Sequence, residues 1–192
     1  MKLTATPLAI RDVLLLEHEI FEDDRGYFME VYKQDVFHEL GLPDKFVQLN
    51  ESRSACNVIR GLHFQWDPPM GKLMRVAEGA AFLVAVDIRH DSPTLGRWVG
   101  ETITAENRLQ MWAPPGCARG LCALTEKTRV QYLCTGMYNG QAESGILWND
   151  RDIGVEWPVS DPRLSGKDRT AQTLREWLAR PESRSFSITS AV

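Results

Sequence analysis

Short apolar segments, separated by Gly, Pro, Asp or Asn, follow one another along most of the chain. In AFLVAVDI the side chains of Phe82, Val84, Val86 and Ile88 alternate with their neighbours and share one face at a period of two. Comparable segments are VLLLEHEIF, YFMEVY, KFVQLNES, NVIRGLHF, KLMRVAEG, RWVGETIT, LQMWAPP, GLCALT, TRVQYLCTG and SGILWND. Many short strands with regular turns predict a mainly β fold, an antiparallel jelly-roll (cupin-like) sandwich or barrel.

Helical spacing occurs in two places. In KQDVFHELGL, apolar residues recur every three to four positions and Gly41 stands where a helix would end. Later, DRTAQTLREWLARP predicts a C-terminal helix with an apolar face of Leu174, Trp177 and Leu178, stopped by Pro181. No repeat or linker divides the chain. We therefore expect one domain over residues 1–192, with 182–192 as a flexible tail.

Charge and hydropathy exclude several classes of function. The 192 residues carry a formal net charge of −4, which gives no general field for nucleic acid. No apolar run approaches the roughly 18 residues of a membrane span, and GAAFLVAV is typical of a buried strand. The N-terminal residues have no apolar signal-peptide stretch. We expect a soluble, cytoplasmic protein that binds neither nucleic acid nor membrane.

The cysteines and histidines do not form a metal-site pattern. The four cysteines lack Cys-x-x-Cys spacing and predict reduced, partly buried thiols, and a nucleophilic role for Cys117 is the weaker alternative. Metal cupins place two histidines on one strand face and a third after a Pro-x-Gly turn. Here His63 is followed by Phe64 and Gln65, and the turn PPGCARG carries Arg119, which cannot ligate a metal. No metal is expected.

The chain resembles the dTDP-4-dehydrorhamnose 3,5-epimerase family. The resemblance rests on ordered segments covering roughly residues 21–168: DDRGYFMEVY, FVQLNESRSACNVIRGLHFQ, GKLMRVAEG, VAVDIRHDSPTLGRWVG, WAPPGCARGLCALTE, YLCTGMYN, ESGILWNDRDIGVEWP and LSGKD. It implies a cofactor-free isomerase whose substrate is a nucleotide-diphosphate-linked 4-keto-6-deoxyhexose. Proton removal beside the ketone would give an enolate, and proton return from the other face would invert C3, C5 or both.

Four residues carry over from the family's motifs as its reacting groups. By resemblance His63 is the base, Asp168 orients it, Tyr132 is the acid, and Lys72 partners the enolate oxygen. Histidine has a suitable pKa for such a base, and a positioned cation or donor stabilises an enolate. Taken singly, His63 and Tyr132 are typical of strand residues, Lys72 of a solvated charge and Asp168 of a helix start. Their joint occurrence in matching contexts favours the catalytic interpretation.

The resemblance also implies binding residues and a homodimer with strands exchanged between subunits. Gln48 and Asn50 match nucleotide contacts, Tyr138 a residue stacked on the base, and Arg25 and Glu30 residues offered to the neighbouring subunit. Arg60 matches a diphosphate contact. By strand alternation Arg60 faces the same way as Leu62, not His63, so a bulge must intervene or the side chain must reach around the strand.

Arg119 departs from the family, which usually has histidine there. Arginine is always charged and cannot act as an acid or base at neutral pH, yet it can stabilise an enolate or bind a diphosphate. This change leaves three alternatives open: the 3,5-epimerase, a single-centre epimerase acting on another nucleotide or keto-sugar, or a catalytically silent cupin that binds a sugar nucleotide.

Overall fold

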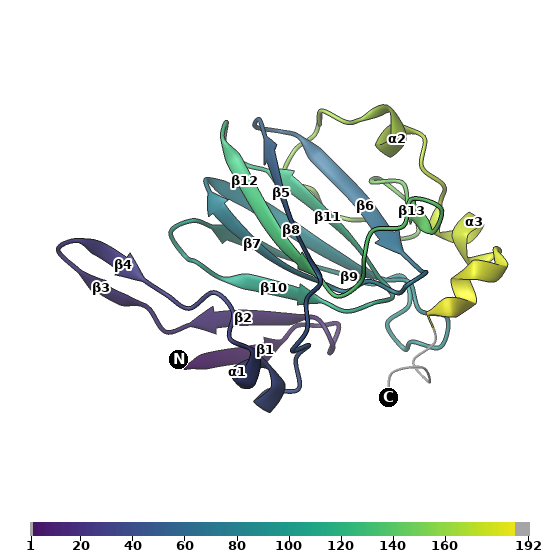
Figure 1. Ribbon diagram of the computed structural model, residues 1–192. Coiled ribbons are helices and arrows are strands. Elements are labelled where there is room, and N and C mark those ends of the chain that lie inside the picture. Colours follow the sequence, from purple (N-terminus) through teal and green to yellow (C-terminus); the bar gives the residue numbers. More distant parts are fainter. Residues whose placement is uncertain (1, 187–192) are drawn as a thin grey trace.

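Two antiparallel β-sheets face each other in the computed structural model, in which residues 2–186 are described (Figure 1). One sheet has the strand order β1-β2-β10-β7-β12-β5 and the other β13-β6-β11-β8-β9. Their bounds are β1 Leu3–Pro7, β2 Leu14–His18, β5 Gln48–Ser54, β6 Ile59–Gln65, β7 Lys72–Glu78, β8 Ala80–Asp87, β9 Trp98–Thr104, β10 Gln110–Ala113, β11 Cys117–Ala123, β12 Thr128–Cys134 and β13 Glu143–Gly145. The predicted mainly β, cupin-like jelly-roll fold is confirmed.

Strand β8 shows how the pattern becomes two packed layers. Ala81, Leu83 and Ala85 point between the sheets and join the central core. The alternating set Phe82, Val84 and Val86, with Ile88, packs in a second cluster that includes Trp177. The predicted shared face of β8 is therefore confirmed, and its opposite face is buried too. A strand buried on both sides gives a near-continuous apolar run, as this one does.

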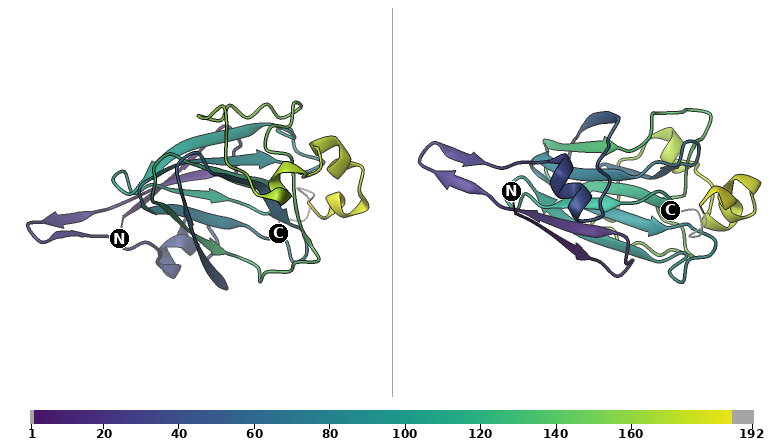
Figure 2. Two further views of the ribbon diagram at one scale, coloured as in Figure 1. Left: turned by 90° about the horizontal axis from the view of Figure 1, so that it is seen from above. Right: turned by 60° about the horizontal axis from the view of Figure 1, so that its bottom comes forward.

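The N-terminal part contains a strand and a hairpin that the apolar pattern outlines poorly. β1 was not predicted, because four of its five side chains are not buried and no apolar alternation marks it. β3 (Phe21–Asp23) and β4 (Gly26–Phe28) form a two-stranded hairpin around the predicted turn. Figures 1 and 2 show this hairpin projecting away from both sheets. The predicted helix is α1 (Gln34–Glu39), after which Gly41 has a φ of +69°.

The C-terminal helix prediction is wrong in its extent. The segment forms two short helices, α2 (Gly166–Arg169) and α3 (Leu174–Leu178). Between them Gln172 bridges the edge of the second sheet, where its carbonyl accepts from Leu147 N–H at 2.8 Å. Thr173 then caps α3 with Glu176 in a capping box, so a new helix begins there. The extended pairing at Gln172 interrupts the helical pattern.

The predicted tail includes residues that pack on the domain. A 3-10 helix, η1, spans Pro181–Ser185, and Phe186 is 3% exposed beside Phe64 and Trp177. Residues 187–192 of the predicted tail lie outside the described residues. The aromatic contact between Phe64 and Trp177, with ring centroids 4.4 Å apart, holds the C-terminal segment on the outer face of β6. None of the helices among residues 2–186 is long and apolar enough to cross a membrane.

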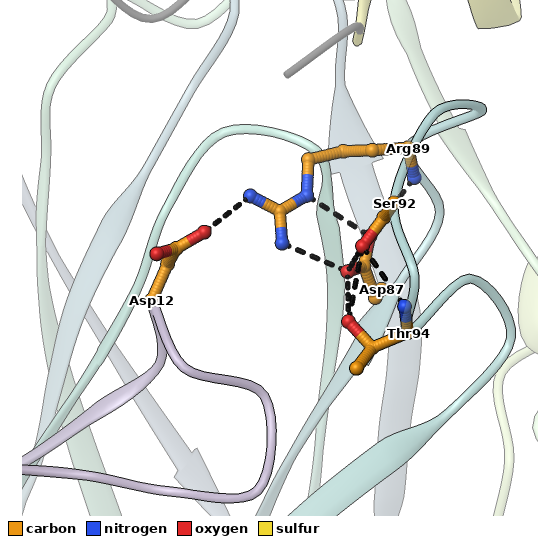
Figure 3. A network of polar contacts seen from close by, with 5 residues as sticks. All are labelled: Asp12, Asp87, Arg89, Ser92 and Thr94. Atoms are coloured by element: carbon orange, nitrogen blue, oxygen red, sulfur yellow. Dashed lines mark hydrogen bonds and ion pairs between the residues drawn. The ribbon is translucent and has the colours of Figure 1, made fainter.

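A network of paired charges ties the turn after β8 to the loop between β1 and β2 (Figure 3). Arg89 donates to both carboxylate oxygens of Asp87, at 3.0 and 2.8 Å, and to Asp12 at 2.7 Å. Ser92 and Thr94 donate to the same Asp87 carboxylate. Burial alone would raise the pKa of Asp87, but these hydrogen bonds outweigh it and hold that pKa low. The buried charge of Arg89 is therefore paired with the buried carboxylate of Asp87 and the more exposed one of Asp12.

Candidate active site

A cleft opens between the two sheets and is lined by strands of both. From the first sheet it takes Ser52, Lys72, Met74, Val130 and Tyr132, and from the second Arg60, His63, Arg119, Gly120 and Leu121. Its empty volume is about 580 Å³, including the open mouth. The cleft contains three of the predicted reacting groups and the predicted phosphate contact, which are His63, Lys72, Tyr132 and Arg60. The fold thus brings together residues that are up to 72 positions apart.

A bulge in β6 brings Arg60 and His63 to the same side of the strand. His63 pairs with Arg119 on β11, whereas Arg60 pairs with Leu121, so β6 uses one more residue than β11 over this stretch. Gly61 lies in the extra step with a φ of +135°, and an added Cβ would lie 2.6 Å from Gly120 Cα. Of the two routes left open by strand alternation, the structure therefore shows the bulge.

Asp168 reaches His63 from the segment that wraps around the edge of the second sheet. The His63 Nε2 to Asp168 Oδ1 distance is 2.6 Å. Ser165 caps α2 and accepts from the Asp168 backbone N–H, which fixes the carboxylate in the first turn. The preceding chain is anchored by the bond from Ile59 N–H to the Arg163 carbonyl. The predicted pair is therefore assembled across 105 residues of sequence.

The charge of Asp168 determines which His63 nitrogen can accept a proton. Burial raises the pKa of Asp168, but the hydrogen bond and charge of His63 and the bond to Ser165 more than offset it, so that pKa is lowered. An ionised carboxylate only accepts hydrogen bonds, so Nε2 carries a proton and donates a hydrogen bond to Asp168. In the neutral ring Nδ1 is then unprotonated. Since Nδ1 has no hydrogen bond to any of residues 2–186, it is available to an incoming group.

Tyr132 and Lys72 face His63 from the opposite sheet. Lys72 Nζ lies 4.9 Å from the centroid of the Tyr132 ring. Burial, with a smaller contribution from Cys134, raises the pKa of Tyr132, so the phenol is protonated at neutral pH. Burial, and after it the charge of Arg119, together lower the pKa of Lys72 to about 8. The cleft therefore holds a protonated phenol, Tyr132, and an ammonium group with a lowered pKa, Lys72, opposite the histidine.

Arg119 lies beneath this surface. Its side chain is almost fully buried, with 4% of the residue exposed, and its Nη1 donates to the Met70 carbonyl at 2.6 Å. Burial lowers the pKa of Arg119 to about 10, which leaves the guanidinium charged at neutral pH. Its Nε and Nη2 have no hydrogen-bond partner among the described residues.

The predicted nucleotide contacts lie along the rim beside the cleft. Gln48 and Asn50 share a face of β5 with the cleft residue Ser52 and bond to each other at 2.9 Å. The Tyr138 backbone N–H donates to Gln48 Oε1 at 3.0 Å, and the Tyr138 ring is exposed. Exposure leaves that ring face available for stacking, while its role stays a prediction.

Two rim residues were missed by the sequence analysis. Glu143 accepts from Tyr138 Oη at 2.9 Å and from Lys167 Nζ at 2.6 Å. Burial raises the pKa of Glu143, but the bonds from Lys167 and Tyr138 outweigh this and lower it. Glu143 also acts electrostatically on both His63 and Lys72. Lys167 immediately precedes Asp168, and that adjacency was the available signal for it.

Arg25 and Glu30, which were predicted to serve a neighbouring subunit, do not line the cleft of their own chain. Arg25 lies in the exposed β3–β4 hairpin and is paired with Asp23. Glu30 follows that hairpin and is also absent from the cleft lining. The expectation that both serve a neighbouring subunit stays a prediction.

The arrangement suits proton transfer. A histidine with a carboxylate on one nitrogen is a usual proton acceptor, and a tyrosine with a raised pKa is a usual donor. The thiol of Cys117 is not activated as a nucleophile, because burial raises its pKa to about 12 and keeps it protonated. Within residues 2–186 no group of three His, Cys, Asp or Glu side chains is placed to hold a metal ion.

Comparison with known proteins places this cleft in a family. The family model for dTDP-4-dehydrorhamnose 3,5-epimerase matches residues 7–176. The chain is 50% identical to the dTDP-4-dehydrorhamnose 3,5-epimerase of Salmonella typhimurium over 173 residues, which cover 88% of this chain and 94% of that protein. A dTDP-4-dehydrorhamnose 3-epimerase of Streptomyces niveus is 36% identical over 172 residues, covering 88% of this chain and 83% of that protein.

A solved structure of an epimerase has the same fold as this chain. The dTDP-6-deoxy-D-glucose-3,5-epimerase of Legionella pneumophila, crystallised with dTDP-4-keto-L-rhamnose, superposes with a TM-score of 0.90 at 38% identity. The match covers 95% of this chain and 97% of that chain.

Proposed function

The chain belongs to the dTDP-4-dehydrorhamnose 3,5-epimerase family of isomerases, and from that premise we propose that it epimerises a dTDP-linked 4-keto-6-deoxyhexose by proton transfer. His63 Nδ1 removes the proton on a carbon beside the ketone, and the bonding electrons move to the keto oxygen. Tyr132 then gives a proton to the same carbon from the other face, which inverts it. The observation that carries the proposal is the His63–Asp168 pair facing Tyr132 across one cleft.

The two sheets supply the opposite faces that inversion requires. His63 is on β6 and Tyr132 is on β12, and these strands belong to different sheets on either side of the cleft. A sugar ring held between them has the base on one face and the acid on the other. Lys72 stabilises the enolate oxygen, as a cation placed where negative charge develops. Asp168 stabilises the imidazolium that forms when His63 takes the proton.

The binding groups at the rim support a nucleotide diphosphate as the anchor. Arg60 lines the cleft, and its Nε bonds to Ser54 at 3.0 Å, which orients the guanidinium. Gln48, Asn50 and the exposed Tyr138 ring lie beyond it along the rim. We assign Arg60 to the diphosphate and the other three to the thymidine end. Binding energy from this remote part of the substrate can hold the reacting carbon in place.

Proton exchange with solvent tests the proposal. In D₂O, proton NMR of dTDP-4-keto-6-deoxyglucose with the enzyme should show deuterium at the carbons on both sides of the ketone. His63→Ala should abolish exchange and leave dTDP binding intact, whereas the control His38→Ala, in an exposed surface pair, should exchange normally. Exchange retained in His63→Ala would contradict the assignment of the base. Absence of exchange with any such sugar in the wild type would favour a silent binding protein.

The acid is tested by separating exchange from inversion. In Tyr132→Phe, His63 can still remove a proton and return a solvent deuteron to the same face. We expect deuterium uptake with retained configuration and inversion slowed by about 10²- to 10⁴-fold, the usual contribution of a positioned acid. Inversion at the wild-type rate would remove Tyr132 from the mechanism.

A single-centre epimerase is the second candidate. Arg119 replaces the histidine expected from the family resemblance, and the Streptomyces niveus relative is a 3-epimerase. Deuterium entering only one of the two carbons would favour this candidate over double inversion.

We further propose a homodimer, because the projecting hairpin exposes Phe21, Tyr27 and Phe28 together with Arg25. Light scattering should give twice the mass of one chain, and a monomeric mass would contradict this. The cytoplasmic location stays a prediction from the sequence.

A further inference from the structure

Arg119 and Lys72 are two cations on facing sheets that line the same cleft. Arg119 projects from β11, and among residues 2–186 its side chain has one hydrogen bond, to the carbonyl of Met70, two residues before Lys72. Its other two nitrogens, Nε and Nη2, are covered by protein atoms and have no partner among the described residues. Arg119 therefore acts from beneath the surface of the cleft that Lys72 also lines, and not as an open docking point for the substrate.

No carboxylate compensates the charge of Arg119. No ion pair joins Arg119 to an acidic side chain within residues 2–186. The titratable groups that act on Arg119 electrostatically are the thiols of Cys117 and Cys134, and burial raises the pKa of both, so they are neutral at neutral pH. An unpaired buried charge disfavours the folded state and raises the free energy of any other cation beside it.

We propose that Arg119 is a positioning residue that makes the Lys72 ammonium a stronger hydrogen-bond and proton donor to the substrate's keto oxygen. This inference rests on the proposed function and deepens it. When His63 takes the carbon-bound proton, the electron pair moves to the keto oxygen, and a Lys72 N–H proton shifts toward that oxygen. Complete transfer leaves a neutral amine and an enol. When Tyr132 reprotonates the carbon, the proton on the enol oxygen returns to Lys72, and the His63 imidazolium and the Tyr132 phenolate then exchange protons with solvent. The permanent charge of Arg119 favours that shift because it repels the ammonium.

The groups around Lys72 act on it in opposite directions. Cys134 on β12 and Glu143 on β13 favour the ammonium, while burial and Arg119 on β11 disfavour it. The Tyr132 ring lies beside Nζ. Glu143 is already engaged by Lys167 and Tyr138. The net result lowers the pKa of Lys72 to about 8, with burial as the larger cause and Arg119 as the second.

Two neutral substitutions separate the charge of Arg119 from its shape. Arg119→Gln and Arg119→Met both remove the charge, but only glutamine can still donate to the Met70 carbonyl. In wild type, kcat/KM should fall tenfold per pH unit above about 8, as Lys72 loses its proton. Both variants should move this alkaline limb upward by roughly one pH unit or less, because burial remains. At pH 7 we expect kcat about three- to tenfold lower with KM little changed.

Met74→Leu provides the packing control. Met74 lines the cleft and carries no charge, so its substitution changes shape alone. It should leave the alkaline limb where the wild type has it, whatever its effect on the rate. A limb that moves equally in Met74→Leu, or that stays in place in both Arg119 variants, would overturn the role assigned to Arg119.

A direct titration tests the same inference without any substrate. Carbon-13 NMR of the lysine ε-carbons, with Lys72 assigned by the signal lost in Lys72→Gln, gives its pKa in each full-length variant. We expect a midpoint near 8 in the wild type and a higher one in Arg119→Gln and Arg119→Met. Equal midpoints would refute the inference even if the enzyme is an epimerase. A shifted midpoint in a protein that exchanges no keto-sugar would refute the proposed function and leave the electrostatic coupling standing.

Discussion

Arg89 and Arg119 are both buried, and both act electrostatically on the thiol of Cys117. Their surroundings differ, because carboxylates stabilise the charge of Arg89 and burial disfavours the charge of Arg119. Arg89 bonds to two carboxylates, and its hydrogen bonds to Asp87 raise its pKa (Figure 3). Within the described part of the chain, the Arg119 side chain bonds to one carbonyl and leaves two nitrogens without a partner, and burial lowers its pKa. A buried arginine that only supports a fold is expected to be paired. Within residues 2–186 the charge of Arg119 thus has no carboxylate partner at the cleft where, in the mechanism that we propose, negative charge develops.

The same contrast separates two of the buried carboxylates, Asp87 and Asp168. Asp87 holds Arg89 and the β8–β9 turn, whereas Asp168 holds one histidine at the cleft. If the division into structural and reacting groups is right, substitutions at the two positions should separate stability from activity.

The largest effect is expected at Asp168. Asp168→Asn removes the charge that fixes the His63 tautomer, so we expect kcat to fall on the order of 10⁴-fold, with a small change in stability. Proton exchange in D₂O measures the rate, and urea unfolding measures the stability. Asp152→Asn, in an exposed pair with Arg175, is the matched control and should keep the wild-type rate. A loss of stability as large as the loss of rate would remove the distinction between the two carboxylates.

A smaller but still large effect is expected at Asp87, on stability. Asp87→Ala leaves Arg89 buried with one partner at the surface, and removing one member of a buried pair costs about 3–5 kcal/mol of unfolding free energy. The kcat per folded molecule should not change. Asp12→Ala removes the exposed partner of Arg89 and should cost only about 0–1 kcal/mol. If Asp12 proved as costly as Asp87, the network would not be organised around the buried pair.

The smallest effect is expected from Arg119→Met. Because no carboxylate loses a partner, the free energy of unfolding should stay unchanged or rise by about 1 kcal/mol. Urea unfolding beside Asp87→Ala gives the comparison directly. A destabilisation of Arg119→Met equal to that of Asp87→Ala would show that Arg119 is structural as well.

The sequence predicted the sheets better than their edges. The apolar run of β8 was long enough to predict a strand because both faces of that strand are buried. β1 was not predicted because it lies at the edge of a sheet and most of its side chains are not buried. The C-terminal helix was predicted too long because periodicity does not detect a backbone bridge such as the one at Gln172. Tertiary contact overrides local propensity in such segments.

The site was predicted by family resemblance more than by physical pattern. His63, Lys72 and Tyr132 lie on different strands, and spacing alone could not show that their side chains meet. Arg60 was correctly recognised as facing the wrong way in a regular strand, and one extra residue in β6 resolves this. Glu143 and Lys167 were missed because their contact joins segments 24 residues apart that carry no shared pattern.

The contact between His63 and Asp168 closes a loop of 105 residues. During synthesis the histidine leaves the ribosome long before the aspartate exists, so a nascent chain with a complete β6 still lacks the paired imidazole. Non-local contacts of this kind form late, after the cost in loop-closure entropy has been met. Catalytic competence should therefore be among the last properties that a refolding chain acquires, and the return of activity would serve as a clock for docking of the C-terminal segment.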